Sequence, residues 1–557
     1  MAWRPGAGFG QREFAELLSN SKDYEGEISG TYSDFAARDR TRGPKILGLI
    51  ETSGRGATAT VKLTVAGERF LNLAPDQEEA FFLNQIAKVQ FPSAVHAQKD
   101  FPELNCRPLT ISLEILLQVG SVTKEEFGLF VLTCIQPTQT QASVDALRAF
   151  RAALKKAKPG LPRKELKERL INERVAFVYQ DDIIAGSTSL REGGKDFIAT
   201  KRQTLAQDYA DSAFRYLITT GLFRIDPHGK TFSIVDSKKT QAKTLIEELG
   251  LGSNYSSWDP ETYIDEYLGN LHQPEISAFT LPKQIERIKA ALDVDLWRTP
   301  TLDEVISELE NETSGIERQL IVEKYTKFQV EAKIAEQQNS LATNRDAVTD
   351  EIVEMFKDIQ DNRSGLVDKP LFFEWNTWRA FTALNDAIAV TGNFRCDSEG
   401  NPLGTASGKQ ADIVAEYEEF WLAIEVTLQS GHKQYETEAE PISRHVGSLQ
   451  RDRRAAGDSR PVYGIFIAPK INETVLNYLM TVGKMNSKVY SGPVQIAPMN
   501  LDAFQAFVLK NQKNGSTNSS RMLAALEETF DTDGFKSGDE PVWFEEVADK
   551  FKDLSLA

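Results

Sequence analysis

The 557-residue sequence is poor in cysteine and histidine, and the few that occur are not spaced to bind a metal ion. The three cysteines (Cys106, Cys134 and Cys396) form no CxxC pair and are odd in number, which argues against a zinc site and against a disulfide framework. A run of about eighteen apolar residues, as a membrane span needs, is also missing, and the N-terminal stretch lacks the apolar core of a secretion signal. We therefore expect a folded cytoplasmic protein that has no membrane partner.

Positive charge is scarce as well, since Asp and Glu outnumber Lys and Arg to give a net charge of −17. A nucleic-acid ligand needs basic residues, and here they are unevenly distributed. Ser143–Arg174 contains ten basic residues against four acidic ones, and Thr301–Gln360 reverses that balance. The basic run is compatible with a polyanion partner and equally with a solvated helix face, so charge alone leaves DNA or RNA binding open.

The length predicts about two to four domains. In the N-terminal half, Lys45–Asn72 predicts two strands around a glycine-rich turn that lead into a helix. Lys201–Val235 predicts an amphipathic helix, with Tyr209, Ala213, Tyr216 and Leu217 on one face, and then a hairpin. Each segment resembles part of a winged helix, so we expect two DNA-recognition subdomains, at residues 1–140 and 141–259.

Basic side chains in these two segments are candidates for contacts with DNA phosphates or base edges, although surface ion pairs would explain each one equally well. The candidates are Arg38, Arg40, Arg42, Lys201, Arg202 and Arg215.

The remaining sequence predicts a helical linker at residues 260–349, broken at Ser314-Gly315, and a domain of mixed strands and helices at residues 350–557. The expected fold class is therefore mixed α/β (α+β), with an N-terminal winged-helix DNA-recognition region before the linker and a mixed sheet after it. Glu374 is expected in the first turn of an amphipathic helix, where an acid most simply compensates the helix dipole.

Two strand-like runs flank Glu418-Glu419, and each carries one acid among apolar residues, Asp412 and Glu425. If Glu418-Glu419 is a two-residue turn, counting outward along both strands places Asp412 directly opposite Glu425, with Cβ atoms about 4.5–5.5 Å apart. Like charges in that position destabilise a sheet, and a shared Mg²⁺ removes the repulsion. Two solvated acids are the alternative, but the same face carries Val414 and Trp421.

The arrangement of a strand acid, a Glu on the next strand and an upstream helical Glu resembles the PD-(D/E)xK nuclease core. The sequences FEWNTW (Phe373–Trp378), GKQAD (Gly408–Asp412), EVT (Glu425–Thr427) and ETEAEPISRH (Glu436–His445) are similar to the AlwI-type family of type IIS restriction endonucleases, which includes nicking enzymes. The likeness extends into the N-terminal half through FPSAVH (Phe91–His96), Arg38-Asp39-Arg40 and RYLITTGLF (Arg215–Phe223).

The resemblance implies an active site made of Glu374, Asp412, Glu425 and Glu438. Asp412 and Glu425, joined by Glu374, would hold Mg²⁺, and Glu438 would complete the acidic pocket.

Two positions depart from the family pattern, because Ala411 stands in place of proline and Thr427 in place of the lysine that polarises the attacking water. Lys433 or Gln434, the latter one turn before Glu438 on a short helix, are candidates to replace that lysine.

The resulting hypothesis is a Mg²⁺-dependent type IIS endonuclease that binds an asymmetric sequence in double-stranded DNA and cuts a few base pairs away. Each catalytic domain would cut one strand, so cleavage of both strands would need a transient homodimer or a second catalytic subunit. Two alternatives stay open: a non-enzymatic winged-helix regulator, and a repair or defence nuclease that recognises DNA structure.

Overall fold

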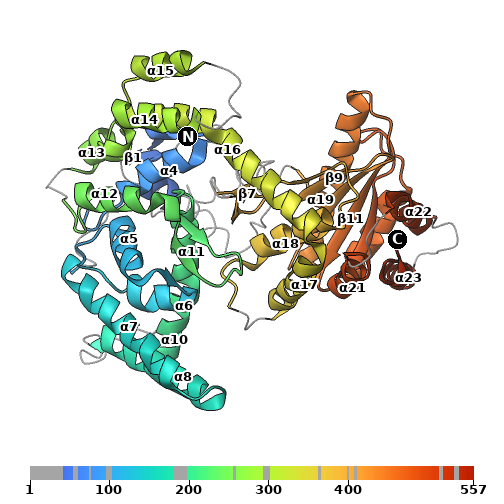
Figure 1. The fold of residues 1–557 in the computed structure, drawn as a ribbon, viewed down its shortest axis with the longest axis horizontal. Coiled ribbons are helices and arrows are strands. Elements are labelled where there is room, and N and C mark those ends of the chain that lie inside the picture. The colour runs from blue at the N-terminus through green and yellow to red at the C-terminus, as the bar shows by residue number, and fades with distance from the viewer. Residues whose placement is uncertain are drawn as a thin grey trace. The chain divides into compact units, whose positions relative to one another are not determined.

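A computed structural model describes residues 42–53, 60–73, 77–95, 103–180, 197–254, 259–292, 301–361, 365–397, 400–406, 410–512, 518–531 and 538–556. The chain forms two compact units (Figure 1), which are described separately below. One comprises Met1–Asp226 and Lys230–Phe328, and the other Pro227–Gly229 and Gln329–Ala557. The division of residues 1–349 into two recognition subdomains and a linker stays a prediction.

The first segment of the N-terminal unit is a hairpin followed by a helix, as the sequence predicted. Strand β1 (Ile50–Ser53) pairs with the antiparallel strand β2 (Thr60–Leu63). The Thr64 hydroxyl then caps helix α3 (Val65–Leu71) by accepting a hydrogen bond from Gly67 N at 3.1 Å. Gly67 is needed there because a Cβ atom at this position would lie 1.9 Å from the carbonyl oxygen of Leu49.

The second predicted hairpin is also confirmed, and it belongs to a three-stranded sheet. Strand β4 (Phe223–Ile225) pairs with β5 (Phe232–Ile234), and β5 pairs on its other side with β3 (Ser121–Val122). Aromatic rings fill the core beneath this sheet, with the Phe214 and Phe232 ring centroids 4.2 Å apart. These contacts tie the hairpin to the helix that precedes it in the sequence.

The apolar face predicted for that helix is only partly right. Leu217 is buried as expected, but Tyr209 and Tyr216 are exposed. The buried side of α11 consists of Ala210, Phe214, Leu217 and Ile218, which follow regular helical spacing.

Helices make up most of the rest of the N-terminal unit. They are α4 (Glu78–Ala87), α5 (Pro108–Val119), α6 (Lys124–Glu126), α7 (Thr140–Lys156), α8 (Leu161–Val178), α10 (Phe197–Gln203), α11 (Ala210–Ile218), α12 (Lys239–Leu249), α13 (Pro260–Tyr263), α14 (Leu281–Leu292), α15 (Leu302–Asn311) and the first half of α16 (Gly315–Thr343), whose residues from Gln329 on belong to the other unit. The predicted break at Ser314-Gly315 separates α15 from α16. Ile288, Leu309 and Val322 are buried together, which packs α14, α15 and the start of α16 into one core.

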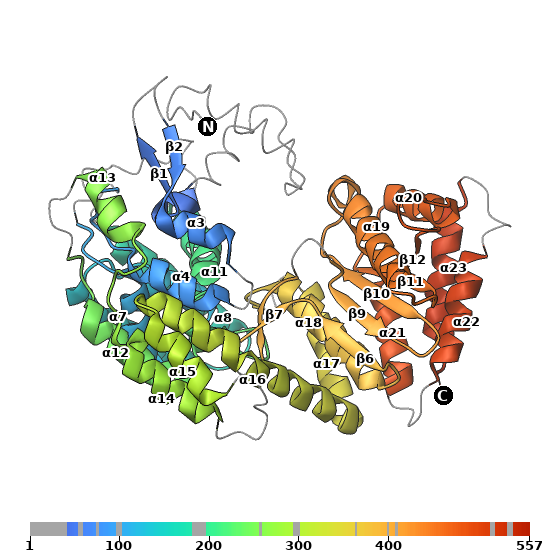
Figure 2. The ribbon, with the colours of Figure 1, turned by 90° about the horizontal axis from the view of Figure 1, so that it is seen from above.

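The C-terminal unit is a five-stranded mixed sheet covered by helices, as Figure 2 shows, so the mixed α/β class is confirmed. The strand order is β12-β11-β10-β9-β6, in which β6, β9 and β10 are antiparallel and β10, β11 and β12 are parallel. These strands are β6 (Ala389–Gly392), β9 (Ile413–Glu416), β10 (Trp421–Val426), β11 (Val462–Ala468) and β12 (Gln495–Asn500). A separate two-stranded ribbon pairs β7 (Arg395–Cys396) with β8 (Pro402–Gly404).

Helices pack on this sheet from both sides. The covering helices are α17 (Arg345–Gln360), α18 (Lys369–Leu384), α19 (His432–Ala455), α20 (Glu473–Lys484), α21 (Leu501–Gln512), α22 (Ser519–Phe530) and α23 (Glu540–Asp553). Helix α18 packs on β6, β9 and β10, and α19 packs on β10, β11 and β12. Across the part of the chain that the structure describes, no helix combines the length and the apolar character of a membrane span.

Candidate active site

The acidic hairpin has the register that the sequence predicted. Tyr417 N donates to Phe420 O at 2.9 Å, which closes the two-residue turn. The β9–β10 ladder then runs outward from that turn as far as Ile413 opposite Ile424, and the same count continued by one residue places Asp412 opposite Glu425. Asp412 Oδ2 accepts a hydrogen bond from Val426 N at 2.9 Å, so the aspartate is held against the end of β10.

Glu374 is buried in the same unit, and the expected surface position in the first turn of a helix is wrong. Helix α18 begins at Lys369, so Glu374 lies in its second turn, with 7% of its surface exposed. Its Oε2 accepts a hydrogen bond from Ala406 N at 2.8 Å. Burial, and secondarily the negative charge of Asp412, raise the pKa of Glu374 to about 9.

Glu438 lies on α19, a helix of 24 residues and not the short helix expected. Its Oε1 accepts a hydrogen bond from the Thr427 hydroxyl at 2.9 Å. That hydroxyl accepts in turn from Gln429 N at 3.1 Å, which fixes its orientation. Thr427, at the position where the family pattern has lysine, therefore holds the Glu438 carboxylate.

The four predicted acids lie close enough to perturb one another electrostatically. Burial raises the pKa of Asp412 well above its ordinary value, and the charges of Glu425 and Glu438 raise it further. Burial likewise raises the pKa of Glu425, followed by the charges of Glu438 and Glu374. Helices α18 and α19 and the β9–β10 hairpin thus bring these carboxyl groups into one acidic cluster, where ionisation of any member opposes ionisation of the others.

The chemistry of this cluster fits a hard divalent cation, although among the described residues no group of three or more His, Cys, Asp or Glu is arranged to hold a metal ion. Mg²⁺ usually binds proteins through only one or two carboxylates and takes its other ligands from phosphate oxygens and water. The facing pair Asp412 and Glu425 offers such ligands and becomes strongly repulsive when both are charged. A cation would remove that repulsion.

His445 is a further member of the site that the sequence reasoning missed. Its Nδ1 lies 2.8 Å from Glu425 Oε1, and both side chains are buried. A signal was present, because His445 follows Glu438 by seven residues, which is two turns of one helix and hence the same face. It also ends the ETEAEPISRH motif. When the Glu425 carboxylate is ionised, the Nδ1–H group of His445 is the donor in this contact.

Of the two candidates to replace the lysine, Gln434 is engaged in other contacts and Lys433 stays a prediction. The Gln434 amide is buried and bonds only backbone groups: its Nε2 donates to Gln429 O and Lys470 O, both at 2.9 Å, and its Oε1 accepts from Asn472 N at 2.8 Å. Gln434 thus joins the start of α19 to neighbouring loops. Lys433 is exposed on the same helix.

Of the predicted DNA contacts, Arg38 and Arg40 lie outside the described residues. Arg42 is exposed. Arg215 is also exposed, and its guanidinium forms an ion pair with Asp211 at 2.8 Å, one turn earlier on α11.

Lys201 and Arg202 both contact neighbouring side chains of the N-terminal unit. Lys201 Nζ lies over the Tyr179 ring, 4.9 Å from its centroid. Arg202 pairs with Glu125 at 2.9 Å and also with Glu168. Arg202 therefore joins α10 to α6 and α8, and the structure gives it a packing role.

Comparison with known proteins gives a family match over most of the chain. The family described as AlwI restriction endonuclease matches residues 46–507. No curated protein matches. Among solved structures, the small subunit of the heterodimeric restriction endonuclease R.BspD6I matches with 24% sequence identity and a TM-score of 0.30. The match covers 36% of this chain and 97% of that chain. Restriction endonuclease FokI matches with 11% sequence identity and a TM-score of 0.23, and this match covers 89% of this chain and 82% of that chain.

Proposed function

This chain belongs to the AlwI restriction endonuclease family and is a type II restriction endonuclease, and we propose that it is a type IIS enzyme. It binds an asymmetric sequence in double-stranded DNA and, with Mg²⁺, hydrolyses a phosphodiester a few base pairs outside that sequence. The observation that carries this proposal is the mutually repulsive acidic cluster of the C-terminal unit, in which Glu374 and Glu425 are buried and Asp412 and Glu438 are partly exposed.

The residues of the cluster have distinct roles in this proposal. Asp412 and Glu425 would hold Mg²⁺, which would supply charge neutralisation at the scissile phosphate and a more acidic water. The Val426 N–H orients Asp412. His445 orients Glu425 and stabilises its ionised form through the 2.8 Å contact. Glu438, held by Thr427, is an acceptor for a proton of the attacking water.

DNA recognition is assigned to the N-terminal unit. The order of elements from α5 through β3, α11, β4 and β5, with the three strands paired as β3-β5-β4, supports a winged helix there. In such a fold one helix enters the major groove and basic residues contact the flanking phosphates. Recognition and cleavage then reside in different units of the chain, as type IIS cleavage outside the bound sequence requires.

One acidic cluster per chain corresponds to cleavage of one strand. Cutting both strands therefore requires a second catalytic unit, supplied by a transient homodimer or by a separate subunit. The substrate is cellular or invading duplex DNA, which makes the cytoplasm the site of action.

The test is cleavage of plasmid and phage DNA of known sequence in the presence of Mg²⁺. We expect nicked or linear products with discrete ends, and sequencing those ends gives the recognition site and the cut position. Asp412→Asn should abolish cleavage and leave gel-shift binding to the same duplex unchanged. Glu418→Gln, an exposed acid in the turn of the same hairpin, is the matched control and should cut normally.

Three outcomes would contradict the proposal. Absence of cleavage on DNA that the protein binds would favour the non-enzymatic regulator. Random degradation would favour a nuclease that recognises DNA structure. Loss of DNA binding together with cleavage in Asp412→Asn would contradict the assignment of the two activities to different units.

A further inference from the structure

We propose that the connection between helices α7 and α8 binds the phosphate backbone of duplex DNA and supplies a sequence-independent part of the affinity. This connection, called the basic turn below, spans Lys155–Lys164 and contains five basic residues and no acidic one. The proposal rests on the proposed function only in taking double-stranded DNA as the ligand.

The structure sorts the ten basic residues of Ser143–Arg174 into two groups. Those away from the turn have partners within the N-terminal unit: Arg148 donates to Gln118 O at 2.9 Å and Arg174 to Leu129 O at 3.0 Å. The others in this group form ion pairs: Arg151 with Glu126 at 2.7 Å, Lys167 with Glu125 at 2.6 Å, and Arg169 with Glu173 at 3.7 Å. The folded unit therefore supplies a partner for each of these five basic side chains.

The five residues of the basic turn are not explained in that way. They are Lys155, Lys156, Lys158, Arg163 and Lys164. All five are exposed, and no carboxylate of the described chain lies within ion-pair distance of them. A protein with a net charge of −17 thus carries an unneutralised positive patch at one end of two helices.

Two of these charges are unfavourably placed in the isolated protein. Arg163 and Lys164 lie in the first turn of α8, which has no acidic residue, and their positive charges oppose the positive end of the helix dipole. Lys155 and Lys156 lie in the last turn of α7, where the dipole favours them, but together with Lys158 they add like charges just before α8 in the sequence. Repulsion of this kind is removed when anionic groups bind, and the phosphates of DNA are closely spaced anions.

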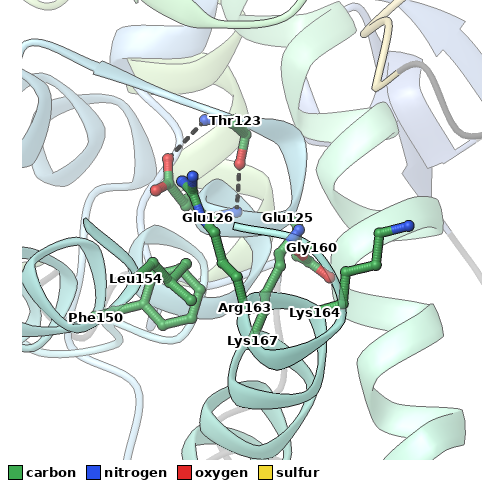
Figure 3. A pocket seen from close by; sticks show the side chains of 9 residues that line it. All are labelled: Thr123, Glu125, Glu126, Phe150, Leu154, Gly160, Arg163, Lys164 and Lys167. Atoms are coloured by element: carbon green, nitrogen blue, oxygen red, sulfur yellow. Dashed lines mark hydrogen bonds and ion pairs between the residues drawn. The ribbon is translucent and has the colours of Figure 1, made fainter. Parts of the chain in front are cut away.

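The patch borders a groove of about 340 Å³ between α8 and the segment around α6. Figure 3 shows Lys164 extending from α8 away from the other lining residues, whereas Lys167 points toward Glu125. The groove is therefore partly neutralised by its own acids, and Lys164 extends away from them. This arrangement suits a ligand that lies across the surface, such as a duplex backbone, better than a small anion inside the groove.

The helices that carry the patch are anchored to the rest of the unit. Glu125 on α6 accepts ion pairs from Lys167 of α8 and Arg202 of α10, and Glu126 accepts one from Arg151 of α7. The basic turn is thereby held in place before DNA binds, which lowers the entropy lost on binding. Its positive field also counters the repulsion between DNA and the acidic remainder of the chain.

The experiment measures the dissociation constant of the full chain for duplex DNA over a salt series, without Mg²⁺ so that no strand is cut. Two probes are used, one duplex that contains the recognition site found from the cleavage products and one that lacks it. The test variant combines Lys156→Gln, Lys158→Gln and Lys164→Gln. The matched control removes three exposed lysines of the same unit that are distant in sequence from the basic turn, Lys243→Gln, Lys289→Gln and Lys327→Gln.

If each of the three lysines contacts one phosphate, the slope of log affinity against log salt should fall by about 2.7 in the test variant. Affinity near 0.1 M salt should fall on the order of 100-fold or more for both probes, so that their ratio is preserved. The control should keep the wild-type slope. Replacement of the same three lysines by arginine should restore it, which separates lost charge from a misfolded helix pair.

An unchanged slope in the test variant, or an equal fall in the control, overturns the proposal while leaving cleavage by the wild-type protein intact. Loss of affinity for the specific probe alone also overturns it, because the contact would then be to bases. Failure of the proposed function looks different, since the wild-type protein would then neither bind nor cut duplex DNA.

Discussion

Replacing Glu374 by glutamine should make the metal-free protein more stable, and the gain should grow with pH. Glu374 is an acid with an ordinary pKa of 4.5 that is held at about 9 in the folded chain, chiefly by burial. Between these two values the folded protein keeps the proton and the unfolded chain releases it. The unfolded state therefore binds fewer protons, and the free energy of unfolding falls as the pH rises.

The size of the effect follows from the same two values. Each pH unit between 4.5 and about 9 removes about 1.4 kcal/mol from the free energy of unfolding. The carboxyl group thus destabilises the fold by about 1 kcal/mol at pH 5.5 and by about 5 kcal/mol at pH 8. Glutamine has no proton to lose, and its amide oxygen can still accept the hydrogen bond from Ala406 N.

The assay is thermal unfolding in EDTA at pH 5.5 and pH 8, followed in the transition of the C-terminal unit. The midpoint of Glu374→Gln should exceed the wild-type midpoint by about 3 °C at pH 5.5 and by about 10 °C or more at pH 8. Glu418→Gln, in the exposed turn, should show no such pH-dependent gain. Equal gains of Glu374→Gln at both pH values, or a variant less stable than wild type at pH 8, would refute the reasoning.

Three further predictions concern single positions. Thr427→Val should lower kcat at unchanged KM, because the Glu438 carboxylate loses the hydroxyl that donates to it at 2.9 Å. Thr427→Ser keeps a hydroxyl and should restore the rate in the same steady-state assay. His445→Ala should reduce the cleavage rate, whereas His445→Asn, which keeps a donor near Glu425, should retain more activity in the same assay. Gly67→Ala should destabilise the N-terminal unit by about 3 kcal/mol or more in denaturant unfolding, since the new Cβ would overlap the carbonyl oxygen of Leu49.

Much of the C-terminal unit could be predicted because its signals are local. A two-residue turn fixes the register of the β9–β10 hairpin by counting, and the apolar runs at β11 and β12 alternate with amphipathic helices. The opposition of Asp412 and Glu425 followed from that register. By contrast, the burial of Glu374 depends on where α18 packs, and helical periodicity alone gave a surface position.

The error in the N-terminal unit has a similar physical origin. Tyr216 and Phe214 both carry aromatic rings, and only the packing of α11 shows that Phe214 is the buried one. The same limit applies to charge. The sequence showed that Ser143–Arg174 is basic, but only the ion pairs of the folded unit distinguish the cations bound to the protein from those left at the basic turn.

The missing lysine now has a physical explanation that does not require a substitute ammonium group. A lysine two residues after Glu425 would contribute a positive charge beside a carboxylate cluster. Thr427 contributes only an oriented dipole, which leaves the cluster more repulsive and more protonated in the metal-free protein. His445 compensates in part, since its imidazole can stabilise ionised Glu425 without a permanent charge. Such a site would depend on a divalent cation for its ionisation more strongly than one that contains lysine. The Thr427 position would thereby couple cation binding to the protonation of Asp412 and Glu425, whose pKa values are raised in the metal-free protein.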